Sequence, residues 1–156
     1  MAAVIVPINR LGDYRKAMAG LRTKGSLAFH MRKEKTEKRA YALRLLLGQE
    51  ALRFFVATSR SQNSKIARSE LLHTLLAEMK LEDSWNLVLD RSSNQQRDFE
   101  TLIRLSRDSG LLLEVSHASR YEDVGLWGPD VLAWYASKIS PTTIPAVTFL
   151  KVKEAP

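Results

Sequence analysis

The sequence predicts an α/β fold in which helices cover both faces of a mixed, largely parallel sheet. Short apolar segments of strand length alternate with segments whose apolar residues recur at helical spacing. Gly, Pro and Ser separate most of these segments. Because strands that alternate with helices build crossover units, parallel pairing is expected. With 156 residues, of which 45% are hydrophobic, the chain is long enough for one core. We expect a single domain over residues 1–156, with 143–156 as a tail or a last strand.

The N-terminal segment predicts a buried strand followed by a helix. Residues 2–8 form a continuous apolar run of strand length, which Asn9 brings to a close. Asn is a favoured N-cap residue, so a helix is expected over 10–22. Apolar residues that share one face of this helix are Leu11, Tyr14, Met18 and Leu21.

Two more strands and two more helices are expected before the middle of the chain. The short apolar run 27–31 predicts a strand, and 51–58 predicts another because aromatic and β-branched residues favour strands. A helix is expected over 36–47, closed by Gly48, and an amphipathic helix over 66–80.

The second half repeats this alternation. Strands are expected at 85–90 and 111–115, and a helix between them at 96–109 with Gly110 beyond its end. A last short strand or tail segment is expected at 146–152.

One helix near the C-terminus carries an acid between two indoles. Pro129 suits a first helical position, so a helix is expected from there to about residue 139. Asp130 follows Trp127 by three residues and precedes Trp134 by four, which places all three on one helix face. Asp130 is then either a first-turn acid that complements the helix dipole or a group that faces a site and needs a cation. The apolar stripe of this helix comprises Val131, Tyr135 and Ile139.

Positive charge is concentrated in the first third of the chain. The net charge is +7, and residues 1–50 hold 11 Lys and Arg against 4 Asp and Glu, while 51–156 hold 13 of each. Such segregation favours a polyanionic partner, although a well-solvated basic face is the simpler alternative. The residues expected to contact nucleic acid are Arg15, Lys16, Arg22, Lys24, Arg32, Lys33, Lys35, Lys38 and Arg39.

Several classes of protein are disfavoured. The chain has no cysteine, so disulfides, thiolate catalysis and cysteine-ligated zinc are excluded. Neither an apolar run long enough for a membrane span nor a signal-peptide pattern occurs, so no membrane partner and a cytoplasmic location are expected. No phosphate-binding glycine loop opens a helix, which argues against a nucleotide-cofactor enzyme.

Four residues are candidates for catalysis. Asp90 ends a predicted strand, Asp130 opens a helix, and His30 and Glu34 lie around another strand end. Carboxylates that converge at strand ends can hold Mg²⁺ or Mn²⁺, so Asp90 and Asp130 are the expected metal pair, with His30 and Glu34 as accessory catalytic residues. The structural alternative for Glu34 is an ion pair with Lys38. For Asp90 it is a pair with Arg91 or Arg97.

The order of these motifs resembles a known family. They are Ala2-Ala3-Val4-Ile5-Val6-Pro7, Phe29-His30 with Glu34 and Arg39, Leu87-Val88-Leu89-Asp90, Glu122, and Leu126-Trp127-Gly128-Pro129-Asp130-Val131-Leu132-Ala133-Trp134. Together they look like actinobacterial members of a domain-of-unknown-function family with a ribonuclease-H-like fold. The resemblance implies a mixed sheet, helices on both faces, and a metal site to which Asp90 and Asp130 contribute.

The chain departs from the family at one point. Members usually open with a strand that ends in Asp-Glu-Ser-Gly, and this segment, which carries the first metal-binding acid, does not occur here. We therefore expect reduced or lost catalysis, because fewer carboxylates hold Mg²⁺ less well. The missing neighbour would leave the edge of strand 2–8 unpaired, so a protein partner or self-association is expected there.

Two functions follow from these observations. The first is a ribonuclease-H-like domain that binds nucleic acid and acts as an Mg²⁺-dependent phosphodiesterase or nuclease with a reduced or lost active site. The alternative is a non-catalytic module that binds protein or nucleic acid through the basic N-terminal third and the open sheet edge.

Overall fold

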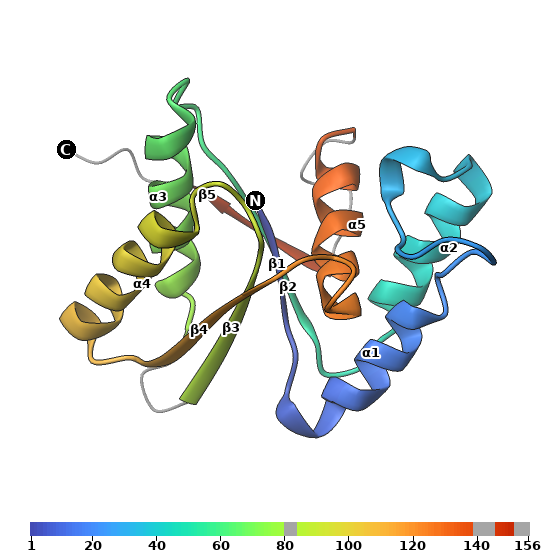
Figure 1. Cartoon of the computed structure of the whole chain (residues 1–156), viewed down its shortest axis with the longest axis horizontal. Coiled ribbons are helices and arrows are strands. Elements are labelled where there is room, and N and C mark those ends of the chain that lie inside the picture. Colours follow the sequence, from blue (N-terminus) through green and yellow to red (C-terminus); the bar gives the residue numbers. More distant parts are fainter. Residues whose placement is uncertain (80–83, 139–145, 152–156) are drawn as a thin grey trace. The chain divides into compact units, whose positions relative to one another are not determined.

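The computed structural model describes residues 1–79, 84–138 and 146–151, which form two compact units. Unit 1 contains Met1 and residues 57–119 and 150–156, and unit 2 contains residues 2–56 and 120–149. Figure 1 shows the elements along the chain: β1 (Ala2–Ile5), η1 (Ile8–Arg10), α1 (Leu11–Ala19), η2 (Met31–Lys33), α2 (Thr36–Leu47), β2 (Arg53–Thr58), α3 (Ser64–Leu76), β3 (Ser84–Asp90), α4 (Gln95–Ser109), β4 (Leu112–Ala118), η3 (Val124–Leu126), α5 (Trp127–Ala136) and β5 (Val147–Lys151).

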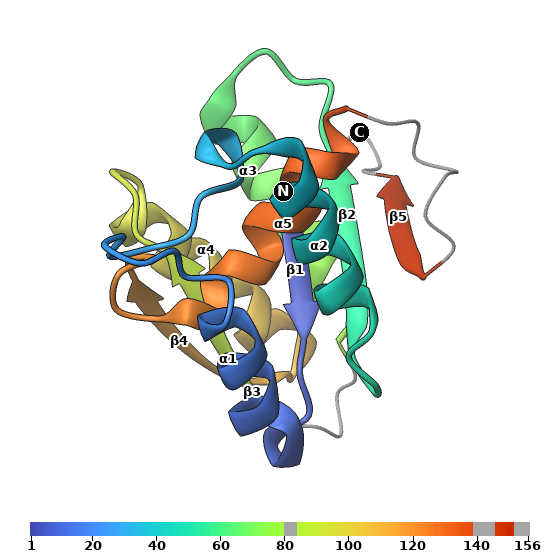
Figure 2. The same cartoon turned by 90° about the vertical axis from the view of Figure 1, so that its right-hand side faces the viewer.

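Unit 2 combines three helices with an antiparallel strand pair. β1 pairs with β2 so that Ala2 lies opposite Val56 and Ile5 opposite Arg53, and the strand order is β1-β2-β5. α5 lies against β1, and α1 and α2 pack beside it (Figure 2). The core residues of this unit are Tyr14, Met18, Leu21, Phe29, Met31, Ala42, Leu46, Phe54, Val56, Trp127, Val131, Leu132 and Val147.

Unit 1 consists of a parallel strand pair with two helices. β3 pairs with β4 in register from Ser84 opposite Leu112 to Asp90 opposite Ala118. α4 ends at Ser109 and is followed by Gly110, whose φ of +73° is a left-handed conformation that glycine adopts without strain. α3 and α4 pack on the strands through a core of Leu72, Leu76, Leu89, Leu102 and Leu111.

The α/β class is confirmed, and the strands pair in both senses. Of the two strand pairs whose register the structure gives, β1 with β2 is antiparallel and β3 with β4 is parallel. The helix expected over 36–47 is α2 without a change of bounds. The strand expected within the tail is present as β5. The ribonuclease-H-like arrangement stays a prediction.

The N-terminal strand and its helix cap differ from expectation. β1 ends at Ile5, before Pro7, which precedes the 3-10 helix η1 with a φ of −57°. Asn9 lies inside η1, and α1 begins after Arg10 with no side-chain cap. The expected strand 2–8 is therefore too long, and the expected cap at Asn9 is wrong.

The strand expected at 27–31 is not formed. Phe29 and Met31 are buried, but Phe29 lies in irregular backbone and Met31 opens the 3-10 helix η2. The amide of Met31 donates its hydrogen bond to the Asp130 carboxylate, so a side chain takes the place of a neighbouring strand.

α5 begins earlier and ends earlier than expected. It starts at Trp127, because the 3-10 turn η3 leads directly into it, and it ends at Ala136. Position 139, the expected end, lies outside the described residues, as does Lys80 at the expected end of α3. Among the described residues, no helix is both long and apolar enough to cross a membrane.

Candidate functional site

The structure brings together two of the four predicted catalytic residues, His30 and Asp130, in unit 2. Nδ1 of His30 lies 3.0 Å from Oδ2 of Asp130, and the two side chains are 29% and 28% exposed. The Met31 amide donates to the same Oδ2 at 3.1 Å. The carboxylate is thus fixed by the backbone beside the imidazole that it faces.

Helix α5 positions Asp130 in its first turn through a tightly packed start. Gly128 lies so close to Tyr14 that a Cβ at this position would collide with the Tyr14 hydroxyl and come within 3.2 Å of a Leu46 methyl group. The hydroxyl donates to the Gly125 carbonyl at 2.6 Å. Burial, together with the nearby Asp123 carboxylate, raises the pKa of Tyr14 above its ordinary value. Only glycine at position 128 allows α5 to sit this close to α1.

An arginine holds the irregular segment that carries His30. Nε of Arg39 donates to the Met31 carbonyl at 2.9 Å, and Nη2 donates to the Arg32 carbonyl at 3.0 Å. The guanidinium also lies 4.6 Å from the centroid of the Trp134 ring. Arg39 on α2 and Trp134 on α5 therefore fix the backbone next to His30 from two helices.

The nine predicted nucleic-acid residues lie in unit 2 and differ in how they are engaged. Arg15 makes a two-point contact with Asp123, with Nη2 2.7 Å and Nε 3.3 Å from the two carboxylate oxygens. Lys38 contacts Thr23 and lies 3.4 Å from Glu34. Arg22 lies 5.9 Å from the Trp127 ring. Five more are exposed, and their side chains form no hydrogen bond or ion pair with another described residue: Lys16, Lys24, Arg32, Lys33 and Lys35.

Glu34 is engaged elsewhere. Its carboxylate pairs with Lys38 four residues later, as the structural alternative predicts. Among the described residues, no group of three or more His, Asp and Glu side chains is arranged to hold a metal ion. Glu34 therefore does not join His30 and Asp130 in such a group.

Asp90 is the last residue of β3 in unit 1, while Asp130 belongs to unit 2. The predicted metal pair thus divides between the two units and stays a prediction. Within unit 2, the groups that meet Asp130 are an imidazole and a backbone amide. Mg²⁺ prefers several oxygen ligands, so these donors do not fit it.

Unit 1 contains a second Asp–His arrangement, which the sequence does not predict. Asp98 on α4 is 3% exposed and accepts from Nε of Arg68 at 2.7 and 2.9 Å. His117 on β4 is 13% exposed, and its Nε2 lies 3.9 Å from Asp98. That nitrogen is buried and forms no hydrogen bond with a described residue. Arg68 and Asp98 are 30 residues apart, and no sequence motif links them.

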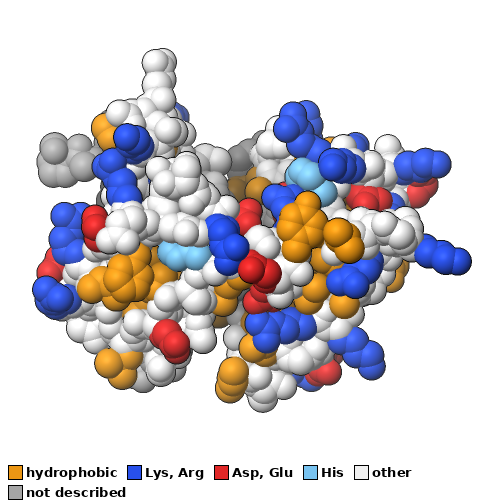
Figure 3. Space-filling view, in the orientation of Figure 1, with side chains coloured by type: hydrophobic (Ala, Val, Ile, Leu, Met, Phe, Trp, Pro, Cys, Tyr) orange, Lys and Arg blue, Asp and Glu red, His pale blue; other side chains and the backbone are white. Residues whose placement is uncertain are grey.

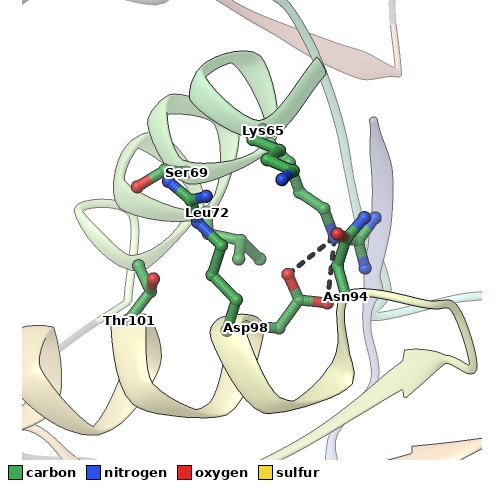
Figure 4. Close-up of a pocket in the computed structure, with 8 residues that line it drawn as sticks. Lys65, Ser69, Leu72, Asn94, Asp98 and Thr101 are labelled. Atoms are coloured by element: carbon green, nitrogen blue, oxygen red, sulfur yellow. Dashed lines mark hydrogen bonds and ion pairs between the residues drawn. The ribbon is translucent and has the colours of Figure 1, made fainter. Parts of the chain in front are cut away.

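A pocket lies beside this ion pair, between α3 and α4 (Figure 4). Its volume of about 10 Å³ has room for about one water molecule. Asp98 and Arg68 already neutralise each other at its wall. The pocket is accordingly too small for a substrate.

No protein-family model matches the chain, and neither a curated protein nor a solved structure matches it. The resemblance to a ribonuclease-H-like family remains a prediction from the quoted motifs.

Proposed function

We propose that unit 2 binds nucleic acid through its basic surface. The observation that carries this proposal is the distribution of charge between the two units. Unit 2 contains 14 Lys and Arg against 7 Asp and Glu, a net +7, whereas unit 1 contains 10 of each, a net of zero. The whole excess of positive charge therefore belongs to one unit, which is the pattern that phosphate-tracking surfaces have.

Free side chains support the same proposal. The basic residues whose side chains have no partner among the described residues lie on and after α1. Lys and Arg side chains are spread over the surface of α1, α2 and the segment between them (Figure 3). Cations without an internal partner can neutralise phosphates and release the counterions bound there. Cations that already pair with an acid, such as Arg15 with Asp123, contribute less.

Salt dependence tests the proposal. The affinity for labelled single-stranded RNA and for the DNA of the same sequence is measured by fluorescence anisotropy at increasing salt. If five cations contact phosphates, the logarithm of the binding constant falls with the logarithm of the salt concentration with a slope of about 3.5, since each contact contributes roughly 0.7 on single strands. A flat salt response would refute the proposal.

A matched pair of variants separates location from total charge. The unit 2 variant carries Gln at Lys24, Arg32, Lys33 and Lys35, and the unit 1 control carries Gln at the exposed Arg60, Lys65, Arg104 and Arg107. Both lose four positive charges. We expect the first to bind at least about tenfold more weakly and to lose most of the salt slope, and the control to change little. Equal losses would mean that only net charge matters.

The sequence also predicts a metal-dependent nuclease activity, which we propose and test separately from nucleic-acid binding. It requires Asp90 and Asp130 to share one centre. Cleavage of RNA and DNA with Mg²⁺ or Mn²⁺, compared between the parent, Asp90→Asn and Asp130→Asn, tests it. Equal rates in all three would end the idea of a metal pair.

A protein partner at the edge of β1 is the second candidate. β1 lies at one end of the described order β1-β2-β5 and consists of Ala, Ala, Val and Ile. An apolar edge strand favours pairing with another chain. Sedimentation at increasing protein concentration tests self-association, and a constant monomer would argue against it.

A further inference from the structure

The imidazole of His30 has a defined orientation. Its Nδ1 lies 3.0 Å from Oδ2 of Asp130. Because a carboxylate only accepts hydrogen bonds, Nδ1 carries a hydrogen, and in the neutral imidazole the lone pair is then on Nε2. The Met31 amide holds the same carboxylate oxygen at 3.1 Å, so Asp130 cannot rotate away without leaving that amide unpaired.

Nε2 of His30 reaches the solvent. It forms no hydrogen bond with a described residue. Among the described side chains, His117 Nε2 is the one polar atom that is both buried and without a hydrogen-bond partner. Nε2 of His30 has no such partner either, so it must be an atom that is not buried. His30 therefore combines an acidic partner on one ring nitrogen with an accessible lone pair on the other.

The surroundings of His30 favour a phosphate. Arg32 and Lys33 follow it by two and three residues and are exposed, and neither side chain has a hydrogen-bond or ion-pair partner among the described residues. Arg39 fixes the backbone at Met31 and Arg32. A nucleic-acid backbone attracted by this surface would bring its phosphates and sugars next to Nε2.

We propose that His30 is a catalytic base that cleaves RNA without a metal ion, and that Asp130 is its positioning residue. This inference rests on the proposed binding of nucleic acid by unit 2. RNA is the substrate class because its 2′-hydroxyl supplies a nucleophile next to each phosphate, so a single base is sufficient to start the reaction. DNA lacks that hydroxyl and is not cleaved by this route.

The reaction balances without a cofactor. Nε2 takes the proton of a 2′-hydroxyl, the 2′-oxygen forms a bond to the adjacent phosphorus, and the bond between phosphorus and the 5′-oxygen breaks. A water protonates the departing 5′-oxygen, and the proton that His30 then releases neutralises the resulting hydroxide. The products are a 2′,3′-cyclic phosphate and a free 5′-hydroxyl.

The test is cleavage of labelled single-stranded RNA in excess EDTA, with the 2′-deoxy version of the same sequence as a substrate control. We expect the parent to cleave the RNA to the two named ends and to leave the DNA intact. His30→Ala should lower kcat by about 100-fold or more, the typical contribution of a general base, and imidazole added to the buffer should restore part of the rate. His73→Ala, which removes an exposed histidine of α3 in unit 1, should cleave like the parent.

Two further variants separate chemistry from folding. His30→Gln keeps an amide that can contact Asp130 and should fold, which far-UV circular dichroism checks, yet it should be as inactive as His30→Ala. Asp130→Asn keeps an oxygen for the Met31 amide and should lower kcat by at least about tenfold with KM unchanged. RNA affinity should change less than about twofold in His30→Ala, His30→Gln and Asp130→Asn.

Each contrary result has a distinct meaning. A parent that binds RNA but does not cleave it in EDTA, or that cleaves only with added Mg²⁺, overturns this inference and leaves nucleic-acid binding intact. Equal cleavage by the parent and His30→Gln overturns it as well. A parent that binds no RNA overturns both.

Discussion

Each unit contains an aspartate that faces a histidine, and the two pairs have different surroundings. In unit 1, Asp98 is 3% exposed and Arg68 neutralises it, while His117 stays 3.9 Å away. In unit 2, Asp130 is 28% exposed and its closest charged or titratable neighbour is His30 at 3.0 Å. The same residue types thus form an internal ion pair in one unit and an accessible acid–base pair in the other. Burial and the presence of an arginine decide between the two outcomes.

The largest difference between the Asp98 and Asp130 pairs should appear in the free energy of unfolding. Asp98→Asn leaves the Arg68 charge without its partner, and breaking a buried ion pair costs roughly 3–5 kcal/mol. Because Arg68 is 27% exposed, we expect the lower end, about 3 kcal/mol. Asp130→Asn should cost about 1 kcal/mol, since the amide oxygen can still accept from Met31.

Urea unfolding of both variants measures these free energies. Comparable losses would mean that the contrast between the two pairs has no energetic basis. Asp108→Asn, which alters an exposed acid of α4, is the control for the loss of a negative charge.

A substitution at Gly128 tests the packing that positions Asp130 in α5. Gly128→Ala forces a Cβ against the Tyr14 hydroxyl and should cost about 1–3 kcal/mol through overpacking. Gly12→Ala in α1 meets no atom within 4 Å and should be neutral or stabilising by about 0.5 kcal/mol. Thermal and urea unfolding compare the two.

Gly128→Ala in a Tyr14→Phe background tests whether the clash with the Tyr14 hydroxyl causes the loss of stability. Removing the hydroxyl should recover part of the loss from Gly128→Ala, because the closest clashing atom is gone. A loss of the same size in both backgrounds would show that the hydroxyl is not responsible.

Alkaline pH probes unit 2 through the same tyrosine. Burial raises the pKa of Tyr14 above its ordinary value of 10.0, so the folded state keeps the phenol proton at a pH where the unfolded state has lost it. The unfolded state then binds fewer protons than the folded state. The stabilisation that Tyr14 contributes is complete below pH 10 and falls as the pH rises above 10. The slope contributed by this one group should reach about 1.4 kcal/mol per pH unit.

Unfolding free energies between pH 9 and 11 (roughly the range in which a free tyrosine ionises) give this slope. Tyr14→Phe should remove the part that belongs to Tyr14. An unchanged slope in that variant would assign it to other groups.

The smallest effect is expected at Glu34. Its partly exposed pair with Lys38 is worth about 0.5 kcal/mol or less, so Glu34→Gln should hardly change unfolding by urea. It should also leave RNA affinity and cleavage unchanged, because Glu34 pairs with Lys38. Loss of cleavage in Glu34→Gln would restore this residue to the catalytic set.

Local signals predicted the regular elements well. α2 has the expected bounds because both signals that define it are local. Its apolar residues recur at helical spacing, and Gly48 follows its last residue. Segregated charge in residues 1–50 likewise indicated the basic unit, to which residues 120–149 also belong. Such features depend on neighbours along the chain.

Contacts between distant residues could not be predicted in this way. His30 meets Asp130 across 100 positions, and the Met31 amide uses that carboxylate instead of a strand partner. The run 27–31 therefore forms no strand. Phe29 and Met31 are buried, whereas Leu27 is exposed. The sequence does not predict the Arg68–Asp98 pair for the same reason, since nothing near either residue marks the other.

The hydrogen bond from Met31 to Asp130 provides a built-in reporter of the site. Met31 is the first residue of the 3-10 helix η2, so its amide has no partner within that helix and is shielded by one carboxylate rather than by a ladder of neighbouring strands. The rate at which this proton exchanges for deuterium therefore follows how often Asp130 departs from the loop. A single resonance in an NMR spectrum would register every opening of the pair, with or without a ligand present.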